Sequence, residues 1–244
     1  MTFKNDPRPW RKLRALSAPI ANAARRLVPH SLRFLYIQRV KGFDAPTEPR
    51  FDPLGYVYFL AKLNESSIYL EYGSGGSTFL AAQKRKRFIS VDSDRYFLRA
   101  VENNISAHGF HDAETQKYIH ADIGLTKGWG YPAFKFRTKA RLAKWVAYSN
   151  APWSGMPADA LPDLILVDGR FRVACALATI KNLQGKANWE LLVDDYPTRP
   201  HYKEIERFAT LDKVVGKMAI FKHKPDIDQQ ELGKALERYS TDWR

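Results

Sequence analysis

The stretch IYLEYGSGGSTFLAA, residues 68 to 82, passes from an apolar, β-prone run through three glycines into a helix-like continuation. Glycine is the residue that lets a backbone turn sharply and leave room for a molecule to come close. The first N–H groups of a helix are free to bind such a molecule. The stretch therefore predicts a strand, a tight ligand-binding turn and a helix.

Further β-prone runs continue this pattern along the chain. They lie at residues 88–91, 118–120, 164–167 and 191–193, with helix-length segments between most of them. Strands that alternate with helices predict an α/β fold with a doubly wound, mostly parallel, Rossmann-like sheet. Residues 213–215 and 218–221, separated by Gly216, predict an antiparallel closing hairpin.

The predicted domain organisation is one α/β domain with an extension before it. Residues 1–50 form a basic N-terminal extension and linker, with helical spacing of apolar residues between Trp10 and Arg39 and three prolines in 46–53. Residues 51–244 form the domain, which starts with a short helix at 56–63 and carries an insertion at about 124–162. The single cysteine, Cys175, lies in an apolar run and is interpreted as a core residue.

Charge is concentrated in the extension. The chain has a net charge of +13, and residues 1–50 hold eleven Lys or Arg against three Asp or Glu, a balance of 11 − 3 = +8. Such a segment fits either peripheral contact of residues 1–41 with an anionic surface or a solvated basic tail. No recognisable nucleic-acid module is present, so a nucleic-acid partner is not expected.

Targeting signals are weak. We find no apolar run of the roughly 20 residues that a transmembrane helix needs. The stretch after Arg14 is interrupted by Ser17, Pro19 and Asn22, which argues against a secretory signal peptide. The expected location is cytoplasmic, with association at a membrane surface as a variant and an organelle transit peptide as the alternative.

Acidic residues follow the predicted strands. Glu71, Asp92 and Asp168 come directly after three strands, Asp122 lies just past another, and the pair Asp194-Asp195 ends the fifth. The carboxyl ends of strands in an open α/β sheet border the ligand crevice, so these acids should converge there. A row of buried carboxylates is costly unless a ligand satisfies it.

The glycine pattern narrows the choice of cofactor. Asp92 follows Gly73 by 19 residues, near the spacing at which an acid meets a ribose. A dinucleotide site normally reads G-x-G-x-x-G, but Thr78 stands at the third glycine position and Glu71 would repel a pyrophosphate. A cofactor with a cationic centre, such as S-adenosylmethionine, would instead be attracted by Glu71. A nicotinamide-dependent oxidoreductase is therefore disfavoured.

The motifs resemble those of the class I S-adenosylmethionine-dependent methyltransferases. Residues 71–76, EYGSGG, look like the first motif of that superfamily, and residues 90–94, SVDSD, look like the second. A bacterial methyltransferase-like group is more similar, through LEYGSGGST (70–78), ADIG (121–124), GWG (128–130), VDGRFRVACALAT (167–179) and DDY (194–196). The likeness covers roughly residues 55–224 and implies the fold and the cofactor, but no acceptor.

The resemblance also implies which residues bind the cofactor. Glu71, Gly73 and Gly75 would hold the methionine part, Asp92 the ribose, and Asp122 with Ile123 the adenine edge, although Asp122 also fits an ordinary loop acid. The full predicted cofactor set is Glu71, Gly73, Ser74, Gly75, Gly76, Ser77, Asp92, Ser93, Asp122, Ile123 and Asp168.

Candidates for proton removal lie beyond the fourth and fifth strands. Methyl transfer to oxygen or nitrogen needs alignment of the acceptor and a base, and the candidates for the base are Asp168, Asp194, Asp195 and His201, of which Asp168, Asp194 and His201 form the predicted catalytic set. His201 fits equally the start of a helix. Asp168, Asp194 and Asp195 are also similar to the magnesium site of catechol-type O-methyltransferases, although those enzymes usually carry Asn where Asp195 stands.

Substrate contacts are predicted from arginines and aromatic residues near the same strand ends. Arg170 and Arg172 suit a carboxylate or phosphate, or else neutralise the local acids, and Tyr196 and Trp129 complete the predicted set. The aromatic and basic residues of 126–145 fit a sugar chain or an amphipathic helix with a solvated face. The expected function is methyl transfer to a small-molecule or glycan-like acceptor; a non-catalytic cofactor-binding or scaffold protein of the same fold is the alternative.

Overall fold

The computed structural model describes residues 30–244, which divide into two compact units at Lys41 and Gly42. In the first unit, helix α2 (His30–Tyr36) continues into a π-helical segment, η1 (Ile37–Lys41). Most of the helical pattern expected between Trp10 and Arg39 lies outside the described residues. Within residues 30–244, no helix has both the length and the apolar character needed to cross a bilayer.

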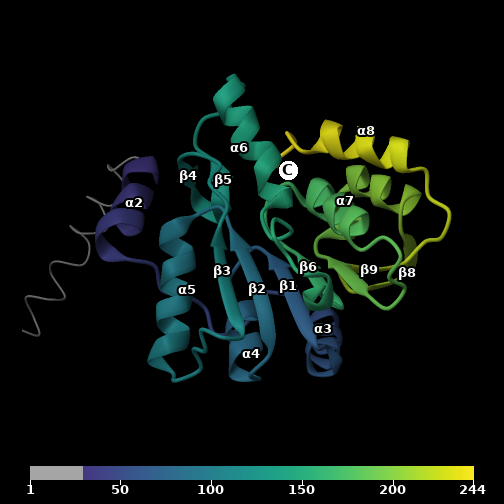
Figure 1. Cartoon of the computed structure of the whole chain (residues 1–244). Helices are drawn as coiled ribbons and strands as arrows, with labels where there is room; N and C mark the ends of the chain where they lie inside the picture. The colour runs from purple at the N-terminus through teal and green to yellow at the C-terminus, as the bar shows by residue number, and fades with distance from the viewer. Residues whose placement is uncertain (1–29) are drawn as a thin grey trace, which may run out of the picture. The chain divides into compact units, whose positions relative to one another are not determined.

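A seven-stranded sheet forms the centre of the second unit, in the order β3-β2-β1-β6-β7-β9-β8 (Figure 1). Strands β1, β2, β3, β6 and β7 are parallel to one another. Strand β9 pairs antiparallel with both β7 and β8. The strands are β1 (Ile68–Tyr72), β2 (Arg87–Asp92), β3 (Gln116–His120), β6 (Leu164–Val167), β7 (Glu190–Val193), β8 (Thr210–Val215) and β9 (Met218–Lys222). The predicted doubly wound sheet and closing hairpin are confirmed.

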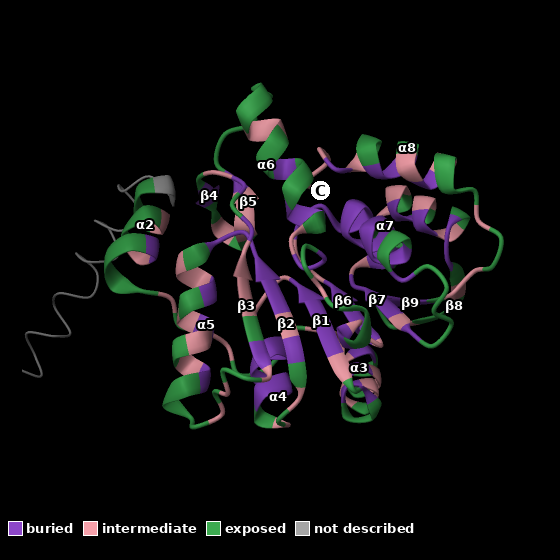
Figure 2. Ribbon diagram, in the orientation of Figure 1, coloured by how far each residue is buried: buried purple, intermediate pink, exposed green. Residues whose placement is uncertain are grey.

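Helices cover both faces of this sheet. One face packs against α3 (Pro53–Glu65), α4 (Gly76–Gln83) and α5 (Arg95–Ala107). The other packs against α6 (Lys139–Asn150), α7 (Arg172–Asn182) and α8 (Gln229–Tyr239), together with the 3₁₀ segment η5 (Pro200–Arg207). Figure 2 shows the buried residues concentrated in β1, β6 and α7, where Cys175 is fully enclosed.

Local sequence explains where the helices begin. Asp52 caps α3 by accepting hydrogen bonds from the Leu54 and Gly55 N–H groups, and Asp94 caps α5 in the same way. Asp52 also accepts a 2.8 Å hydrogen bond from the Lys217 N–H in the β8–β9 turn, which ties the first helix to the closing hairpin. Capping of this kind satisfies N–H groups that the helix itself leaves free.

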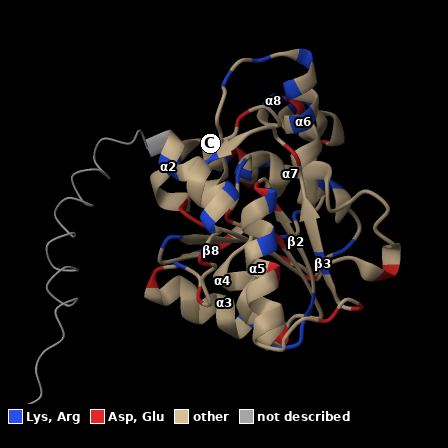
Figure 3. Ribbon diagram, turned by 90° about the vertical axis from the view of Figure 1, so that its left-hand side faces the viewer, with Lys and Arg blue, Asp and Glu red and all other residues tan. Residues whose placement is uncertain are grey.

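The segment between β3 and β6 holds several short elements. These are β4 (Thr126–Lys127), η2 (Gly128–Gly130), β5 (Tyr131–Pro132), α6 and η3 (Ala158–Ala160). Figure 3 shows Lys and Arg positions along α6, whereas Trp145 and Tyr148 of the same helix are buried. The helix is therefore amphipathic, with a basic outer face.

Candidate functional site

The turns after β1 and β6 meet at the centre of the sheet. The strands β2 and β3 lie on the β1 side of this point, and β7 lies on the β6 side, so the strand order reverses here. Gly73 has φ +101°, and a Cβ atom there would lie 2.6 Å from the Gly169 nitrogen. A side chain at Gly169 would in turn lie 2.7 Å from the Tyr148 hydroxyl. Only glycine fits at positions 73 and 169, because the two backbone segments lie so close together. This contact places Asp168, the residue before Gly169, beside the glycine turn. Ligands of doubly wound sheets bind at this switch point.

Glu71 lies beneath the glycine turn and has no exposed surface. Its carboxylate accepts hydrogen bonds from the hydroxyls of Tyr69, Ser77, Thr78 and Ser90. Burial raises the pKa of this carboxyl, and the four hydroxyl donors act against that rise. Its oxygens are thus enclosed by the protein, so the geometry gives Glu71 the role of holding the turn instead of the direct cofactor contact expected from the sequence.

The two serines of the glycine turn are also engaged within the protein. Ser77 donates to Glu71, and the Ser74 hydroxyl lies 2.7 Å from the Ser90 hydroxyl. The Gly75 N–H donates to the Thr78 hydroxyl at 2.8 Å. The turn is therefore prearranged by its own side chains.

Asp92 ends β2 next to the turn and is 8% exposed. Its carboxylate accepts hydrogen bonds from the Ser74 N–H at 3.0 Å and the Asp94 N–H at 2.7 Å. Burial raises the pKa of Asp92 to about 7, against the opposing effect of these two donors. Ser93 follows and donates its hydroxyl to the Gly130 carbonyl at 3.2 Å, which joins the end of β2 to the η2 segment.

The residues expected at the adenine edge lie in the loop after β3. Asp122 pairs with Lys144 at 2.6 Å and accepts from the Gly124 N–H, and the lysine lowers the pKa of that carboxyl. Ile123 is buried, and its carbonyl accepts a hydrogen bond from the Trp145 indole at 3.2 Å. Two residues of α6 therefore hold the loop after β3 in place. The predicted contact of this loop with adenine stays a prediction.

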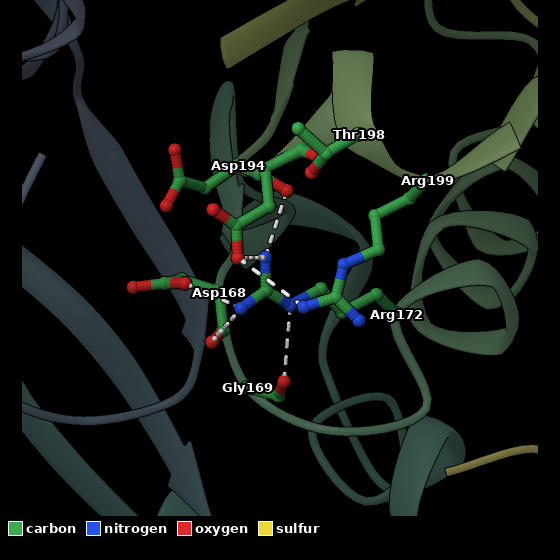
Figure 4. Close-up of polar contacts among 7 residues, drawn as sticks. Asp168, Gly169, Arg172, Asp194, Thr198 and Arg199 are labelled. Atoms are coloured by element: carbon green, nitrogen blue, oxygen red, sulfur yellow. Dashed lines mark hydrogen bonds and ion pairs between the residues drawn. The ribbon is translucent and has the colours of Figure 1, made fainter. Parts of the chain in front are cut away.

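Arg172 occupies the centre of the acidic cluster beyond β6 and β7 (Figure 4). Its guanidinium donates to the Asp168 carboxylate at 2.8 Å and to the Asp195 carboxylate at 3.3 Å. It also donates to the backbone carbonyls of Gly169 and Asp194, at 3.1 and 2.7 Å. Arg199 adds an ion pair with Asp195 at 3.7 Å. Arg172 thus neutralises local acids, which was one of its two expected roles.

This arrangement corrects the predicted magnesium site. Asp168 and Asp195 turn toward the Arg172 guanidinium, whereas the Asp194 side chain points away from it in Figure 4. Across residues 30–244 no group of three or more His, Cys, Asp or Glu residues is arranged to hold a metal ion. The positive charge among these acids is an arginine that the chain supplies itself.

Asp194 is the acid of this cluster that retains bonding capacity. It is 8% exposed, and its Oδ1 atom is enclosed without a hydrogen-bond partner among the described residues. Burial, followed by the nearby charges of Asp168 and Asp195, raises the pKa of Asp194 to about 7. A carboxylate with a pKa near the working pH is suited to accept a proton.

Arg170 lies in the β6–α7 turn, and Trp129 lies in η2. The Arg170 guanidinium carbon lies 4.2 Å from the centre of the Tyr131 ring, and the residue is 8% exposed. Trp129 is 73% exposed, has φ 63°, and carries the Arg50 guanidinium 5.4 Å from its ring centre. Both predicted substrate residues are thus near the strand ends, and Trp129 is open to solvent.

Tyr196 and His201 lie in the 3₁₀ segments η4 (Tyr196–Thr198) and η5 that follow β7. The Tyr196 hydroxyl donates to Glu206 and its ring packs edge-on against Phe221, so this tyrosine is a packed core residue and does not face a substrate. His201 lies at the start of η5, as its alternative interpretation supposed, with its ring against Tyr202. Burial lowers the pKa of His201. Its role as a base stays a prediction.

The sequence analysis missed a segment, residues 43–52, that packs over the glycine turn. A Cβ at Gly76 would lie 1.9 Å from the Glu48 carbonyl carbon, and one at Gly75 would lie 3.8 Å from Pro46. Phe43 packs edge-on against Phe97, and the Ala45 carbonyl accepts a hydrogen bond from Asn104. Its two prolines, with a third at Pro53, made this segment resemble a linker, although rigid extended residues also suit a segment that packs on the domain.

Several other site residues were also overlooked. Ser90 faces Glu71 directly across the β1–β2 register, a pairing of two polar residues in buried strands that could have signalled their contact. Thr78 was noted only as a missing glycine, yet its hydroxyl holds both Glu71 and the Gly75 N–H. Tyr131 follows the GWG sequence, and nothing in the sequence indicated that it would meet Arg170.

Comparison with known proteins gives a structural match with substantial sequence identity. A methyltransferase-like protein from Silicibacter pomeroyi is 32% identical, with a TM-score of 0.69 over 81% of this chain and 98% of that protein. The S-adenosylhomocysteine-bound methyltransferase PaMTH1 of Podospora anserina is 14% identical, with a TM-score of 0.45 over 91% and 100% of the two chains. The S-adenosylmethionine complex of the O-methyltransferase TomG of Streptomyces achromogenes is 15% identical, with a TM-score of 0.46 over 81% and 100%. No protein-family model and no curated protein sequence matches the chain.

Proposed function

We propose that the chain, which belongs to the family of a methyltransferase-like protein, uses S-adenosylmethionine to methylate an oxygen or nitrogen of a small-molecule or glycan-like acceptor. One observation carries the proposal. The glycine turn after β1 meets the turn after β6, with the nearly buried carboxylates of Asp92 and Asp194 at the neighbouring strand ends. Two such acids at a switch point suit a ligand that offers hydroxyl or cationic groups.

The residues around the turn fit this cofactor. When bound, S-adenosylmethionine supplies a methyl group attached to a sulfonium. Asp92, at the end of β2, would accept hydrogen bonds from the ribose hydroxyls with the lone pairs that Ser74 and Asp94 leave free. The backbone of Gly73 and Gly75 would lie along the methionine part, and Glu71 would act by holding Ser77 and Thr78 in place. Ile123, with Asp122, would border the adenine.

On the acceptor side, Asp194 is the group we assign to proton removal. Its Oδ1 atom is unpartnered within the described residues, and its pKa of about 7 allows it to take a proton near neutral pH. Arg172 positions it, because the guanidinium holds the Asp194 backbone carbonyl at 2.7 Å while keeping Asp168 and Asp195 occupied. Asp168 is thereby a positioning residue as well.

The test is formation of S-adenosylhomocysteine by the full-length protein, followed by mass spectrometry across a panel of hydroxylated and amino acceptors that includes monosaccharides and sugar acids. We expect acceptor-dependent product, reduced at least 100-fold in Asp194→Asn. Asp226→Asn is the matched control, because Asp226 is an exposed acid in the loop before α8. Binding of S-adenosylmethionine without product from any acceptor would favour the non-catalytic alternative.

A further inference from the structure

Arg170 is a buried cation that forms no ion pair in the described part of the chain, although its charge opposes the burial that raises the pKa of Asp168. It is 8% exposed, and its Nε atom is enclosed with no hydrogen-bond acceptor among these residues. None of the carboxylates in residues 30–244 forms an ion pair with it. Its neighbour Arg172 is also buried but is surrounded by the carboxylates of Asp168 and Asp195 and by three backbone carbonyls. The two arginines of the same turn therefore have opposite surroundings.

The side chain of Arg170 contacts a phenol, that of Tyr131. Its guanidinium lies over the Tyr131 ring, and Arg170, Arg199 and Arg172 together lower the pKa of Tyr131 against the effect of burial. These groups come from β5, the β6–α7 turn, the start of α7 and the junction between η4 and η5. Because Asp168 and Asp195 already pair with Arg172 and Arg199, Arg170 is the guanidinium of the three that remains without a carboxylate.

A guanidinium removed from water without a counter-charge is costly, so a chain that buries one commonly provides an anion for it. The planar guanidinium of arginine can donate two parallel hydrogen bonds to two oxygens of a carboxylate or a phosphate. Arg170 lies two residues after Asp168, on the turn that meets Gly73, and thus at the same strand ends as the groups assigned to methyl transfer.

We propose that Arg170, together with the Tyr131 hydroxyl, binds an oxyanion carried by the acceptor, a carboxylate or a phosphate. The acceptor is then an acidic molecule, and its charged group, held at Arg170, sets which of its atoms faces the methyl donor. This assignment rests on the proposed methyl transfer for the word acceptor, whereas the oxyanion site itself does not require it.

The test measures anion binding to the full-length protein without the methyl donor. Inorganic phosphate and malonate are titrated while the Arg170 Nε–H resonance is followed by NMR on arginine-labelled protein, identified by its loss in Arg170→Lys. We expect a saturable shift of that resonance, and at least tenfold weaker binding in Arg170→Gln and Tyr131→Phe. Arg238→Gln is the matched control, since Arg238 also lies over a tyrosine ring, 5.4 Å from that of Tyr239, but is exposed.

Saturation with phosphate, malonate or both supports the site, and the anion that binds more tightly indicates whether the acceptor carries a phosphate or a carboxylate. Equal affinity of wild type and Arg170→Gln, or an Nε–H resonance that does not move, overturns it. Should Arg170→Gln fail to fold, the wild-type resonance and Tyr131→Phe still decide the matter. We expect Arg170→Gln to keep its affinity for S-adenosylmethionine within twofold, so loss of the anion site and failure of the methyl-transfer proposal are separate results.

Discussion

Asp92 and Asp194 share one property at the scale of single residues: burial raises the pKa of each carboxyl to about 7. They differ in their partners, because Asp92 accepts two backbone N–H groups whereas the Oδ1 atom of Asp194 has no partner within residues 30–244. An enclosed acid with unused bonding capacity is a feature of ligand sites, where stability is exchanged for function.

The first prediction concerns Asp194 and pH. Its pKa is raised from the usual 3.8 to about 7, so the folded chain holds the proton more tightly than the unfolded chain. The resulting stabilisation is present below about pH 4 and is lost as the pH rises to about 7. We expect Asp194→Asn to be more stable than wild type by about 2–4 kcal/mol at pH 8 and to show little difference at pH 4, by urea unfolding.

Asp226→Asn serves again as the control in this experiment, because its carboxyl is exposed. The same Asp194→Asn variant should lose turnover, so stability and activity move in opposite directions. A variant that is less stable than wild type at pH 8 would contradict the burial of an unpartnered charge at this position.

The second prediction concerns Glu71. Replacing it with alanine leaves the hydroxyls of Tyr69, Ser77, Thr78 and Ser90 without their shared acceptor. We expect Glu71→Ala to lose about 2–4 kcal/mol of unfolding free energy and to bind S-adenosylmethionine at least tenfold more weakly, because the turn is no longer held. Glu65→Ala, at an exposed acid of α3, should change neither quantity. Normal cofactor affinity in a folded Glu71→Ala protein would show that the turn does not need this anchor.

At the scale of elements, the contact between the 43–52 segment and the start of α4 decides how the glycine turn is covered. The third prediction follows from the space at Gly76, where a methyl group would lie 1.9 Å from the Glu48 carbonyl carbon. We expect Gly76→Ala to cost about 1–3 kcal/mol of stability, because the segment must move away. Gly233→Ala in α8 meets no atom within 4 Å and should be neutral or slightly stabilising. Equal stability of the two variants, by thermal unfolding, would contradict the packing of the segment on the turn.

Elements were predictable from the sequence where one local pattern decided them. The alternation of β-prone and helical segments gave β1, β2, β3, β6 and β7, and Gly216 marked the β8–β9 hairpin. The glycine turn and the acids after the strands pointed to the candidate site from local sequence alone. The roles of single side chains were not predictable, because they depend on contacts between distant segments: Arg172 reaches Asp195, and Tyr196 reaches Phe221.

At the scale of the whole molecule, charge is divided between the two units. Residues 1–41 hold ten Lys or Arg and one Asp, a balance of 10 − 1 = +9 out of a net +13. In the described part of this unit, Leu32, Leu35, Tyr36 and Val40 are exposed beside Arg33 and Arg39. We propose that this unit binds anionic surfaces such as acidic lipid vesicles, because basic and exposed apolar residues together favour an interface.

The fourth prediction tests that proposal with the full-length chain. Co-sedimentation with vesicles containing phosphatidylserine should fall at least fivefold when Arg11, Lys12 and Arg14 are replaced by serine, since each basic residue near such a surface contributes about 1 kcal/mol. Replacement of Lys181, Lys186 and Lys203, exposed lysines of the second unit, removes the same charge and should have little effect. Equal loss in both variants would indicate a net-charge effect, and no binding by wild type would leave the unit without this role.

The central claim, a cofactor site at the β1–β6 switch point that accepts S-adenosylmethionine, is tested most directly by calorimetric titration. The full-length protein is titrated with S-adenosylmethionine, S-adenosylhomocysteine and NAD, and the titrations are repeated with Asp92→Asn. We expect the first two ligands to bind and NAD to fail, with a loss of at least tenfold, about 1.4 kcal/mol, in the variant. Binding of NAD in preference to S-adenosylmethionine, or no binding of either sulfur cofactor, would contradict the claim.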